Sequence, residues 1–249
     1  MSFAATAIAK RYGTAFLDIV YPRRCEMCET LLDAGRPDAG RWLCDDCLKG
    51  LLRIEPPFCN VCGEPYDGAA TDEFRCGNCA DLKLHFDFAV APYRAEGSVR
   101  ELVHRFKYNQ RLDLRGVLGC LLAHALRDGR FATEKDWLIV PVPLHAARER
   151  ERQFNQAWEL CQQLARITGH PAEQVLSRIR ATPQQAALTR HQRIENLRKA
   201  FAVKGSTQGK KVLLVDDVLT TGSTTSECAR VLKRDGGVEK VVVITVARG

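Results

Sequence analysis

Eight of the 11 cysteines fall between residues 25 and 79, where they form four C-x-x-C pairs. The pairs are Cys25/Cys28, Cys44/Cys47, Cys59/Cys62 and Cys76/Cys79. Each C-x-x-C turn presents two sulfur atoms from one tight knuckle, and two such turns complete a tetrahedral Cys₄ shell at about 2.3 Å from Zn²⁺. A segment of about 35 residues buries too little apolar area to fold alone, so bound metal must supply free energy. The pattern predicts a double zinc ribbon over residues 25–85.

The pairing of the cysteines follows from loop length. Sequential pairing closes the shorter loops and therefore costs less entropy. It predicts one site of Cys25, Cys28, Cys44 and Cys47 and a second of Cys59, Cys62, Cys76 and Cys79. An interleaved arrangement, in which the first pair joins the third, is the alternative. Four sulfur ligands leave no open position for water, so we expect both zinc ions to be structural; a redox C-x-x-C or another metal or cluster is the remaining alternative.

The sequence outside the cysteine pairs indicates the cellular compartment. Dense cysteine is also typical of secreted, disulfide-linked modules. The apolar residues 4–9 are followed directly by Lys10 and Arg11, without the long apolar region and cleavage site of a signal peptide. The longest apolar run, residues 117–123, is much shorter than the roughly 20 residues of a spanning helix. We therefore expect a cytoplasmic protein without membrane insertion, with residues 1–24 as a helical lead-in.

Residues 86–249 form the second predicted domain, in which strand-like and helical patterns alternate. We predict strands at 86–94, 137–144, 175–179, 211–218 and 238–247. We predict helices at 97–127 (with a break at 109–110), 155–168 and 223–234. Continuous apolar strands that alternate with helices are typical of an α/β fold, a parallel sheet with helices on both faces. Ligands of such sheets bind beyond the carboxyl ends of the strands.

Charge separates the two predicted domains. Residues 1–85 carry a net charge of −3 and residues 86–249 a net charge of +10. The excess positive charge predicts an anionic partner for the second domain, such as phosphate, pyrophosphate or nucleic acid. A solvated basic surface without a partner is the alternative.

The most informative stretch, residues 212–225, reads V-L-L-V-D-D-V-L-T-T-G-S-T-T. A buried strand carries Asp216 and Asp217 to its end, and residues 220–224 turn directly into a helix. Gly222 permits a positive φ, and the N–H groups of the turn and of the helix start form a cradle for an anion. The carboxylates should face neutral hydroxyls or a cation. These parts together predict a ribose 5-phosphate site.

Two alternatives explain less of this stretch. A Walker A loop requires Gly-Lys-Ser/Thr, and the loop contains no lysine. A helix N-cap after a buried strand accounts for Ser223 or Thr224 but not for the paired aspartates.

The stretch resembles the 5-phosphoribosyl 1-pyrophosphate (PRPP) motif of type I phosphoribosyltransferases. The resemblance implies that Asp216 and Asp217 are catalytic and hold the ribose 2′- and 3′-hydroxyls. It implies that Mg²⁺ accompanies PRPP. It assigns ligand contacts along the motif to Val215, Val218, Thr220, Thr221, Gly222, Ser223 and Thr224.

A second segment resembles the pyrophosphate loop of the ComF family. It runs V-P-V-P-L-H over residues 140–145 and continues through Arg148, Arg150, Arg152, Phe154, Asn155 and Gln156. The resemblance implies ligand contacts by Pro143, Leu144, His145, Arg148 and Arg152, and arginine pairs bidentately with phosphate oxygens. The family usually has Gly where this chain has Gln153, which affects close backbone approach there. Alternating Arg and Glu at 148–152 could instead be a solvated helix start.

The resemblance to the ComF family covers nearly the whole chain. Residues 180–201 are also similar to the family and are either a lid over the reacting centre or an ordinary exposed loop. The resemblance implies a double zinc ribbon joined to a type I phosphoribosyltransferase fold. It also implies a part in natural competence, with handling of incoming single-stranded DNA.

Two functions remain open from the sequence. The second domain transfers phosphoribosyl from PRPP to an unidentified acceptor, or it binds the ligand while basic residues hold single-stranded DNA. The second reading uses Arg100, Arg105, Lys107, Arg111 and Arg115, which interleave with Phe106 and Tyr108. An amphipathic helix with both rings in the core is the alternative. The acidic ribbon favours contact with proteins, such as those of DNA uptake, over contact with DNA.

Overall fold

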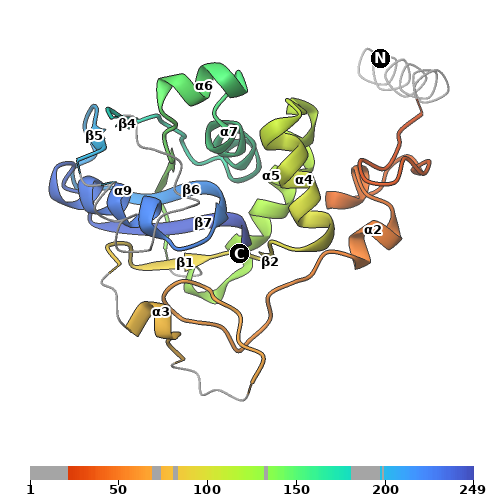
Figure 1. Ribbon diagram of the computed structural model, residues 1–249, viewed down its shortest axis with the longest axis horizontal. Coiled ribbons are helices and arrows are strands. Elements are labelled where there is room, and N and C mark those ends of the chain that lie inside the picture. The colour runs from red at the N-terminus through yellow and green to blue at the C-terminus, as the bar shows by residue number, and fades with distance from the viewer. Residues whose placement is uncertain (1–21, 69–73, 81–83, 132–133, 181–196, 198) are drawn as a thin grey trace, which may run out of the picture. The chain divides into compact units, whose positions relative to one another are not determined.

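The computed structural model describes residues 22–68, 74–80, 84–131, 134–180, 197 and 199–249 (Figure 1). The chain divides into two compact units, Met1–Leu51 and Leu52–Gly249. Most of the expected lead-in at 1–24 and of the similar segment at 180–201 lies outside the described residues.

A five-stranded parallel sheet forms the centre of the larger unit. Its strands are β1 (Phe88–Val90), β2 (Tyr93–Arg94), β3 (Trp137–Pro141), β6 (Lys211–Leu219) and β7 (Lys240–Arg248). The order is β1-β7-β6-β3, and β2 continues the edge by pairing with β7 beyond β1. The nearly unbroken apolar composition of β3, β6 and β7 is what a sheet covered on both faces requires. The predicted parallel sheet is confirmed.

Helices cover both faces of this sheet. Alternate side chains of β6 and β7, such as Val212 and Val243, share a core with Cys228 and Leu232 of α9 (Ser223–Arg234). The intervening side chains point to the other face, and α5 (Arg115–Ala123) and α7 (Gln156–Thr168) pack against the sheet there. Figure 1 shows α9 at the left of the view and α7 above the sheet.

The remaining elements lie around the sheet. They are α3 (Gly77–Ala80), α4 (Gly97–Tyr108), η2 (Leu112–Leu114), η3 (His124–Arg127), η4 (Gly129–Phe131), α6 (Ala146–Arg152), β4 (Leu176–Arg178) and β5 (Phe201–Val203). The expected helix break is confirmed, because α4 ends at Tyr108 with Asn109 as its C-cap, and Gln110 has a φ of 53°. Helix α7 starts at the Asn155 cap and ends at Gly169 in the left-handed conformation.

The strand expected at 175–179 forms, but outside the central sheet. It is β4, which pairs antiparallel with β5. Only Leu176 of its three residues is buried, so this strand has the one-sided burial of an antiparallel pair and not the two-sided burial of a central parallel strand.

The smaller unit carries η1 (Asp38–Arg41) and α2 (Asp45–Lys49). Leu43, which lies between these two helices in the sequence, is fully buried. The four cysteines of this unit are those of the first predicted zinc site. The second set belongs to Leu52–Gly249. The boundary between the two compact units therefore falls between the two cysteine sets, whereas the sequence pattern predicts one domain over residues 25–85 that contains both sets. No helix in the described parts of the chain is long and apolar enough to cross a membrane.

Candidate functional site

The acidic pair lies near the end of β6, where the sequence places it. Asp217 is buried and forms an ion pair with Lys107 of α4, with 2.7 Å between Nζ and Oδ1. The same Oδ1 accepts a hydrogen bond from the Val218 backbone N–H at 2.7 Å. Asp216 Oδ1 accepts one from the Asp217 N–H at 2.9 Å. Both carboxylates are therefore held in place by the strand's own backbone.

Burial controls the protonation of this pair. Burial, together with the negative charge of Asp217, raises the pKa of Asp216 to about 7 in spite of the nearby positive charge of Lys107. Burial acts to lower the pKa of Lys107, but its attraction to Asp217 outweighs this, and the pKa is raised. Lys107 is thus a cation at neutral pH, and Asp216 changes charge near neutrality.

The turn after the strand begins helix α9. Gly222 has a φ of +73°, as predicted, and caps the helix N-terminus. A Cβ at this position would lie no closer than 3.6 Å to any neighbour, so the left-handed backbone, not crowding, requires glycine. Thr221 Oγ1 lies 3.0 Å from Ser223 Oγ. The Thr225 hydroxyl donates to the Gly222 carbonyl at 3.1 Å. The predicted strand, turn and helix all form.

The second predicted segment follows β3 on the neighbouring strand. His145 caps α6, and its Nδ1 accepts from the Ala147 N–H at 3.3 Å. Helix α6 ends at Gln153, which has a φ of 67°. The chain therefore adopts here the backbone conformation that glycine favours, although it carries a side chain. Asn155 ties the segment together, because its Nδ2 donates to the Val142 carbonyl at 3.2 Å.

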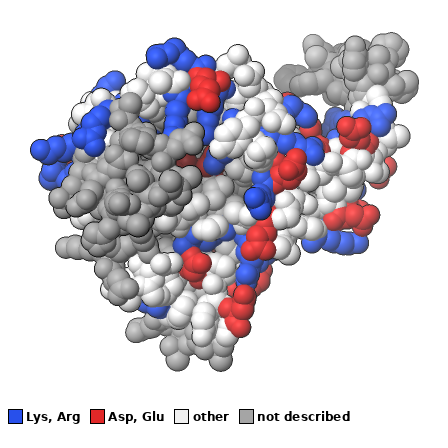
Figure 2. Space-filling view, in the orientation of Figure 1, with Lys and Arg blue, Asp and Glu red and all other residues white. Residues whose placement is uncertain are grey.

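The arginines of α6 lie on two different faces of the helix. Arg148 and Arg152, one helical turn apart, are half-buried, whereas Arg150 between them is exposed. Figure 2 shows basic side chains around acidic ones over α6, at the top of the view. Arg152 donates to Gln156 Oε1 at 3.1 Å, and its guanidinium lies 5.2 Å from the Tyr108 ring centroid. The helix is solvated on one face and presents two cations on the other.

These segments surround one cavity of about 460 Å³. The predicted residues that line it are Pro143, Leu144, Arg148, Arg152, Asp216, Asp217, Val218, Thr220 and Thr224. Five others, His145, Val215, Thr221, Gly222 and Ser223, lie outside the lining. Val215 is fully buried between Pro141 and Ile244 on the neighbouring strands. Carboxylates and hydroxyls at one wall suit ribose or Mg²⁺, and the arginines suit an anion.

The sequence interpretation missed the wall that α4 contributes. This wall consists of Val99, Arg100, Val103, His104, Lys107 and Tyr108. Arg178 and the C-terminal Gly249 also line the cavity. The basic and aromatic residues of α4 were visible in the sequence, but its pattern did not indicate which strand they would face. Gln156 also lines the cavity, and its Nε2 is buried without a hydrogen-bond partner among the described residues.

The predicted basic stripe for DNA is largely paired within the protein. Arg105 lies 2.7 Å from Glu101, Arg111 2.6 Å from Asp113 and Arg115 3.0 Å from Glu159, and Lys107 holds Asp217. Phe106 is fully buried, as the amphipathic-helix alternative predicts, whereas Tyr108 is 61% exposed. Phe106 therefore cannot stack on a base, whereas Tyr108 can, and DNA binding by the basic residues stays a prediction. Glu101 and Asp113 were the sequence signal for this pairing.

The eight cysteines form two clusters, in the predicted sequential pairing. One contains Cys25, Cys28, Cys44 and Cys47, and the other contains Cys59, Cys62, Cys76 and Cys79. Within each cluster the four sulfur atoms all lie within 4.8 Å of one another. Four converging thiol sulfurs are the donor set of a structural zinc site, so the residues fit the two predicted zinc ions.

Comparisons with known proteins find one match for the cysteine-rich segment and another for the second part of the chain. A model of the double zinc ribbon domain matches residues 16–80, and a model of the phosphoribosyl transferase domain matches residues 157–249. The chain is 32% identical over 222 residues to the DNA utilization protein YhgH of Salmonella typhimurium, covering 88% of this chain and 94% of the relative. It is 33% identical over 212 residues to competence protein F of Haemophilus influenzae, covering 83% and 90%.

Two further proteins are similar to this chain at lower identity. Competence protein ComFC of Bacillus subtilis is 26% identical over 212 residues, which cover 83% of this chain and 84% of the relative. Among solved structures, one described as the allosteric regulatory enzyme of purine biosynthesis is 20% identical. That match covers 56% of this chain and 25% of that chain, with a TM-score of 0.34.

Proposed function

Because the chain belongs to the ComF family of competence and DNA utilization proteins, we propose that it binds PRPP with Mg²⁺ and serves in the handling of imported single-stranded DNA. One observation carries the ligand assignment. The acidic pair, the turn before α9 and two arginines of α6 meet around a single cavity of about 460 Å³. This combination matches the parts of PRPP: two ribose hydroxyls, a 5′-phosphate and a pyrophosphate.

Each part of the ligand has its own group of residues in this proposal. Asp216 and Asp217 accept hydrogen bonds from the ribose hydroxyls or hold water bound to Mg²⁺. The hydroxyls of residues 220–224 and the N–H groups at the start of α9 bind the 5′-phosphate. Arg148 and Arg152 bind the pyrophosphate. Strands β3 and β6 are parallel neighbours, so their following segments lie at the same edge of the sheet.

Lys107 belongs to this site as well. Its Nζ forms an ion pair with Asp217 and therefore competes with ribose hydroxyls for that carboxylate. With the hydroxyls bound, the lysine is close enough to the cavity to add positive charge opposite a phosphate. We therefore assign Lys107 to the binding of the ligand and not to DNA.

A second candidate function is phosphoribosyl transfer to a small acceptor, with no direct role in DNA handling. Transfer develops positive charge on C1 of the ribose and negative charge on the leaving pyrophosphate. The carboxylates would stabilise the positive charge on C1, and the arginines and Lys107 would stabilise the negative charge on the pyrophosphate. The observation in its favour is again that the acidic pair, the turn before α9 and two arginines of α6 surround one cavity. The acceptor is not indicated by any side chain of the cavity.

Calorimetric titration with PRPP and Mg²⁺ tests the ligand assignment. The Asp216→Asn/Asp217→Asn double variant should retain its circular dichroism spectrum and lose binding. Asp235→Asn/Glu239→Gln removes the same charge from exposed positions and should bind like the wild type. Unchanged affinity in the first variant would refute the assignment. Pyrophosphate release with a panel of bases and amines, together with salt titrations of oligonucleotide binding, separates the two candidate functions.

The pH dependence of the same titration is a sharper test of Asp216. Its pKa of about 7 means that the carboxyl is protonated in acid and ionised in base. Only the ionised form accepts two hydroxyls or a cation well, so affinity should rise between pH 6 and pH 8. Asp216→Asn should bind weakly and show a much smaller change over this range.

A further inference from the structure

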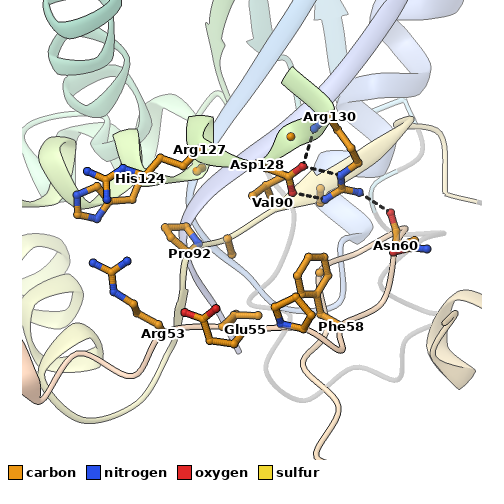
Figure 3. A pocket seen from close by; sticks show the side chains of 17 residues that line it. Arg53, Glu55, Phe58, Asn60, Val90, Pro92, His124, Arg127, Asp128 and Arg130 are labelled. Atoms are coloured by element: carbon orange, nitrogen blue, oxygen red, sulfur yellow. Dashed lines mark hydrogen bonds and ion pairs between the residues drawn. The ribbon is translucent and has the colours of Figure 1, made fainter. Parts of the chain in front are cut away.

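A second cavity, of about 410 Å³, lies in the unit Leu52–Gly249. It shares no lining residue with the cavity of the acidic pair. Its walls come from three places: the segment 53–63 at the start of the second ribbon, the sheet edge at 89–92, and residues 124–130 in η3 and η4 (Figure 3). The function proposed above leaves this cavity unused.

Basic side chains gather at one end of the second cavity. They are Arg53, His124 and Arg127 (Figure 3). His124 Nδ1 lies 2.6 Å from the hydroxyl of Tyr93, and the Arg53 guanidinium lies 5.8 Å from the centroid of the same ring. Burial raises the pKa of Tyr93, while the positive charges of Arg53 and Arg127 both act to lower it, so both cations lie near that hydroxyl.

The charges at this end are available to a ligand. Arg53 and Arg127 are both exposed, and within the described parts of the chain neither forms an ion pair. Glu55 is the one carboxylate of the lining besides Asp128. Asp128 is already occupied, because it holds Arg130 at 2.7 Å. Two unpaired guanidinium groups that face one cavity are a good site for a phosphate.

Phe58 lies at the other end of the cavity, next to Arg130 and Asn60 (Figure 3). Val90 and Pro92 add apolar surface to the lining. Arg130 also lines the cavity, with its guanidinium 5.9 Å from the Phe58 ring centroid and 4.2 Å from the centroid of Phe88. The same guanidinium donates to the Asn60 carbonyl at 2.9 Å. This end therefore offers a half-buried aromatic ring, with a cation beside it, to a flat ligand.

We propose that this cavity binds one nucleotide of single-stranded DNA, with its phosphate at Arg53 and Arg127 and its base against Phe58. The inference rests on the proposed function, from which the ligand class comes. A cationic end next to an aromatic end is what one nucleotide requires, since the backbone needs charge and the base needs a stacking surface. The volume lies in the range of pockets for small ligands. The ion pairs along α4 leave this cavity as the better candidate for DNA contact.

Anisotropy of a fluorescent oligo(dT), measured over a range of salt concentrations, tests the phosphate contact. Arg53→Gln/Arg127→Gln should lower affinity at least about tenfold and flatten the log–log salt slope by about 0.7, the value for the one phosphate that both arginines contact. Arg166→Gln/Lys204→Gln removes two exposed charges elsewhere and should change the slope much less. Both variants should bind PRPP like the wild type, which shows that they fold.

A second pair of measurements tests the stacking contact. Phe58→Leu keeps an apolar side chain but removes the ring, and should weaken oligo(dT) binding about tenfold. It should leave the binding of an abasic oligonucleotide of the same length unchanged. Equal losses for the two oligonucleotides would contradict stacking on Phe58.

The outcomes separate this inference from the proposed function. If the wild type binds oligo(dT) and Arg53→Gln/Arg127→Gln binds it equally well, the inference is wrong and the proposed function stands. If the wild type shows no salt-sensitive binding of oligo(dT), this inference is wrong, and so is the DNA-handling part of the proposed function. If free thymidine monophosphate binds as tightly as the oligonucleotide, the cavity is a site for a free nucleotide and the assignment to DNA is wrong.

Discussion

The two four-cysteine clusters share one sequence motif but differ in their surroundings. In the first cluster Cys25 is buried, Cys28 is exposed, and the other two are half-buried. In the second cluster all four cysteines are buried. Val61 and Leu84 pack against the second cluster and also against the core of the central sheet. The second ribbon is thus part of the sheet's unit, while the first belongs to Met1–Leu51.

The second cluster is also connected to the turn at residues 220–224, before α9. Arg248, at the end of β7, lies 3.9 Å from Cys62 Sγ and forms an ion pair with Glu64. The same side chain donates to the Leu219 carbonyl at 3.0 Å, directly before the turn. A Cβ on Gly222 would lie 3.8 Å from Leu84. The same cysteine motif therefore belongs to a separate compact unit in one case and packs against the sheet and the turn before α9 in the other.

Cysteine substitution should produce the largest difference between the clusters. Cys62→Ser and Cys28→Ser should each lose one of two zinc ions, measured by mass spectrometry. Cys62→Ser should also lose PRPP binding and unfold at much lower temperature, because structural zinc supplies on the order of 10 kcal/mol in small ribbons. Cys28→Ser should retain PRPP binding. Equal effects on PRPP binding would show that the clusters are equivalent.

Loss of Arg248 should have the next largest effect. Arg248→Met removes one partner of a buried network and should lower the free energy of unfolding by about 2–4 kcal/mol. It should weaken PRPP binding too, because the Leu219 carbonyl loses one of its two donors and keeps only the Gly249 N–H. Arg94→Met breaks an exposed pair with Asp67 and should cost about 1 kcal/mol or less. Similar chemical denaturation curves for the two variants would argue against a link from the second cluster to the turn.

Zinc release should differ more modestly. With a chelator in excess, we expect two phases of equal amplitude. The faster phase should come from the first cluster, about tenfold faster, since Cys28 is exposed. Cys28→Ser should lack the fast phase. A single phase for both zinc ions in the wild type would remove the kinetic distinction.

The smallest effect should come from the apolar contact. Leu84→Ala removes a partly buried side chain between the second cluster and the sheet, and should cost about 1–2 kcal/mol, less than a fully buried leucine. It should weaken PRPP binding slightly. Leu52→Ala, at an exposed position of the same unit, is the control and should have little effect.

Much of the fold was predictable because its signals are local. The predicted helix at 223–234 and its glycine turn have the observed bounds. Helix α7 ends at the predicted Gly169. The antiparallel pairing of β4 with β5 was not predictable, because three-residue strands carry too little pattern to identify a partner. The candidate site was predictable along β6 and α6, and was missed where α4 completes it.

The sequence by itself determined the four C-x-x-C pairs, the direction of the sheet and the acidic strand end followed by a glycine turn. These depend on spacing within one segment, where chain geometry leaves few choices. Only the tertiary structure decided that Lys107 holds Asp217, that Arg248 reaches Cys62 from 186 residues away, and that Arg53 and Arg127 face one cavity. Such contacts depend on the register of strands and the packing of helices, which bring distant residues together without leaving a periodic signal in the chain.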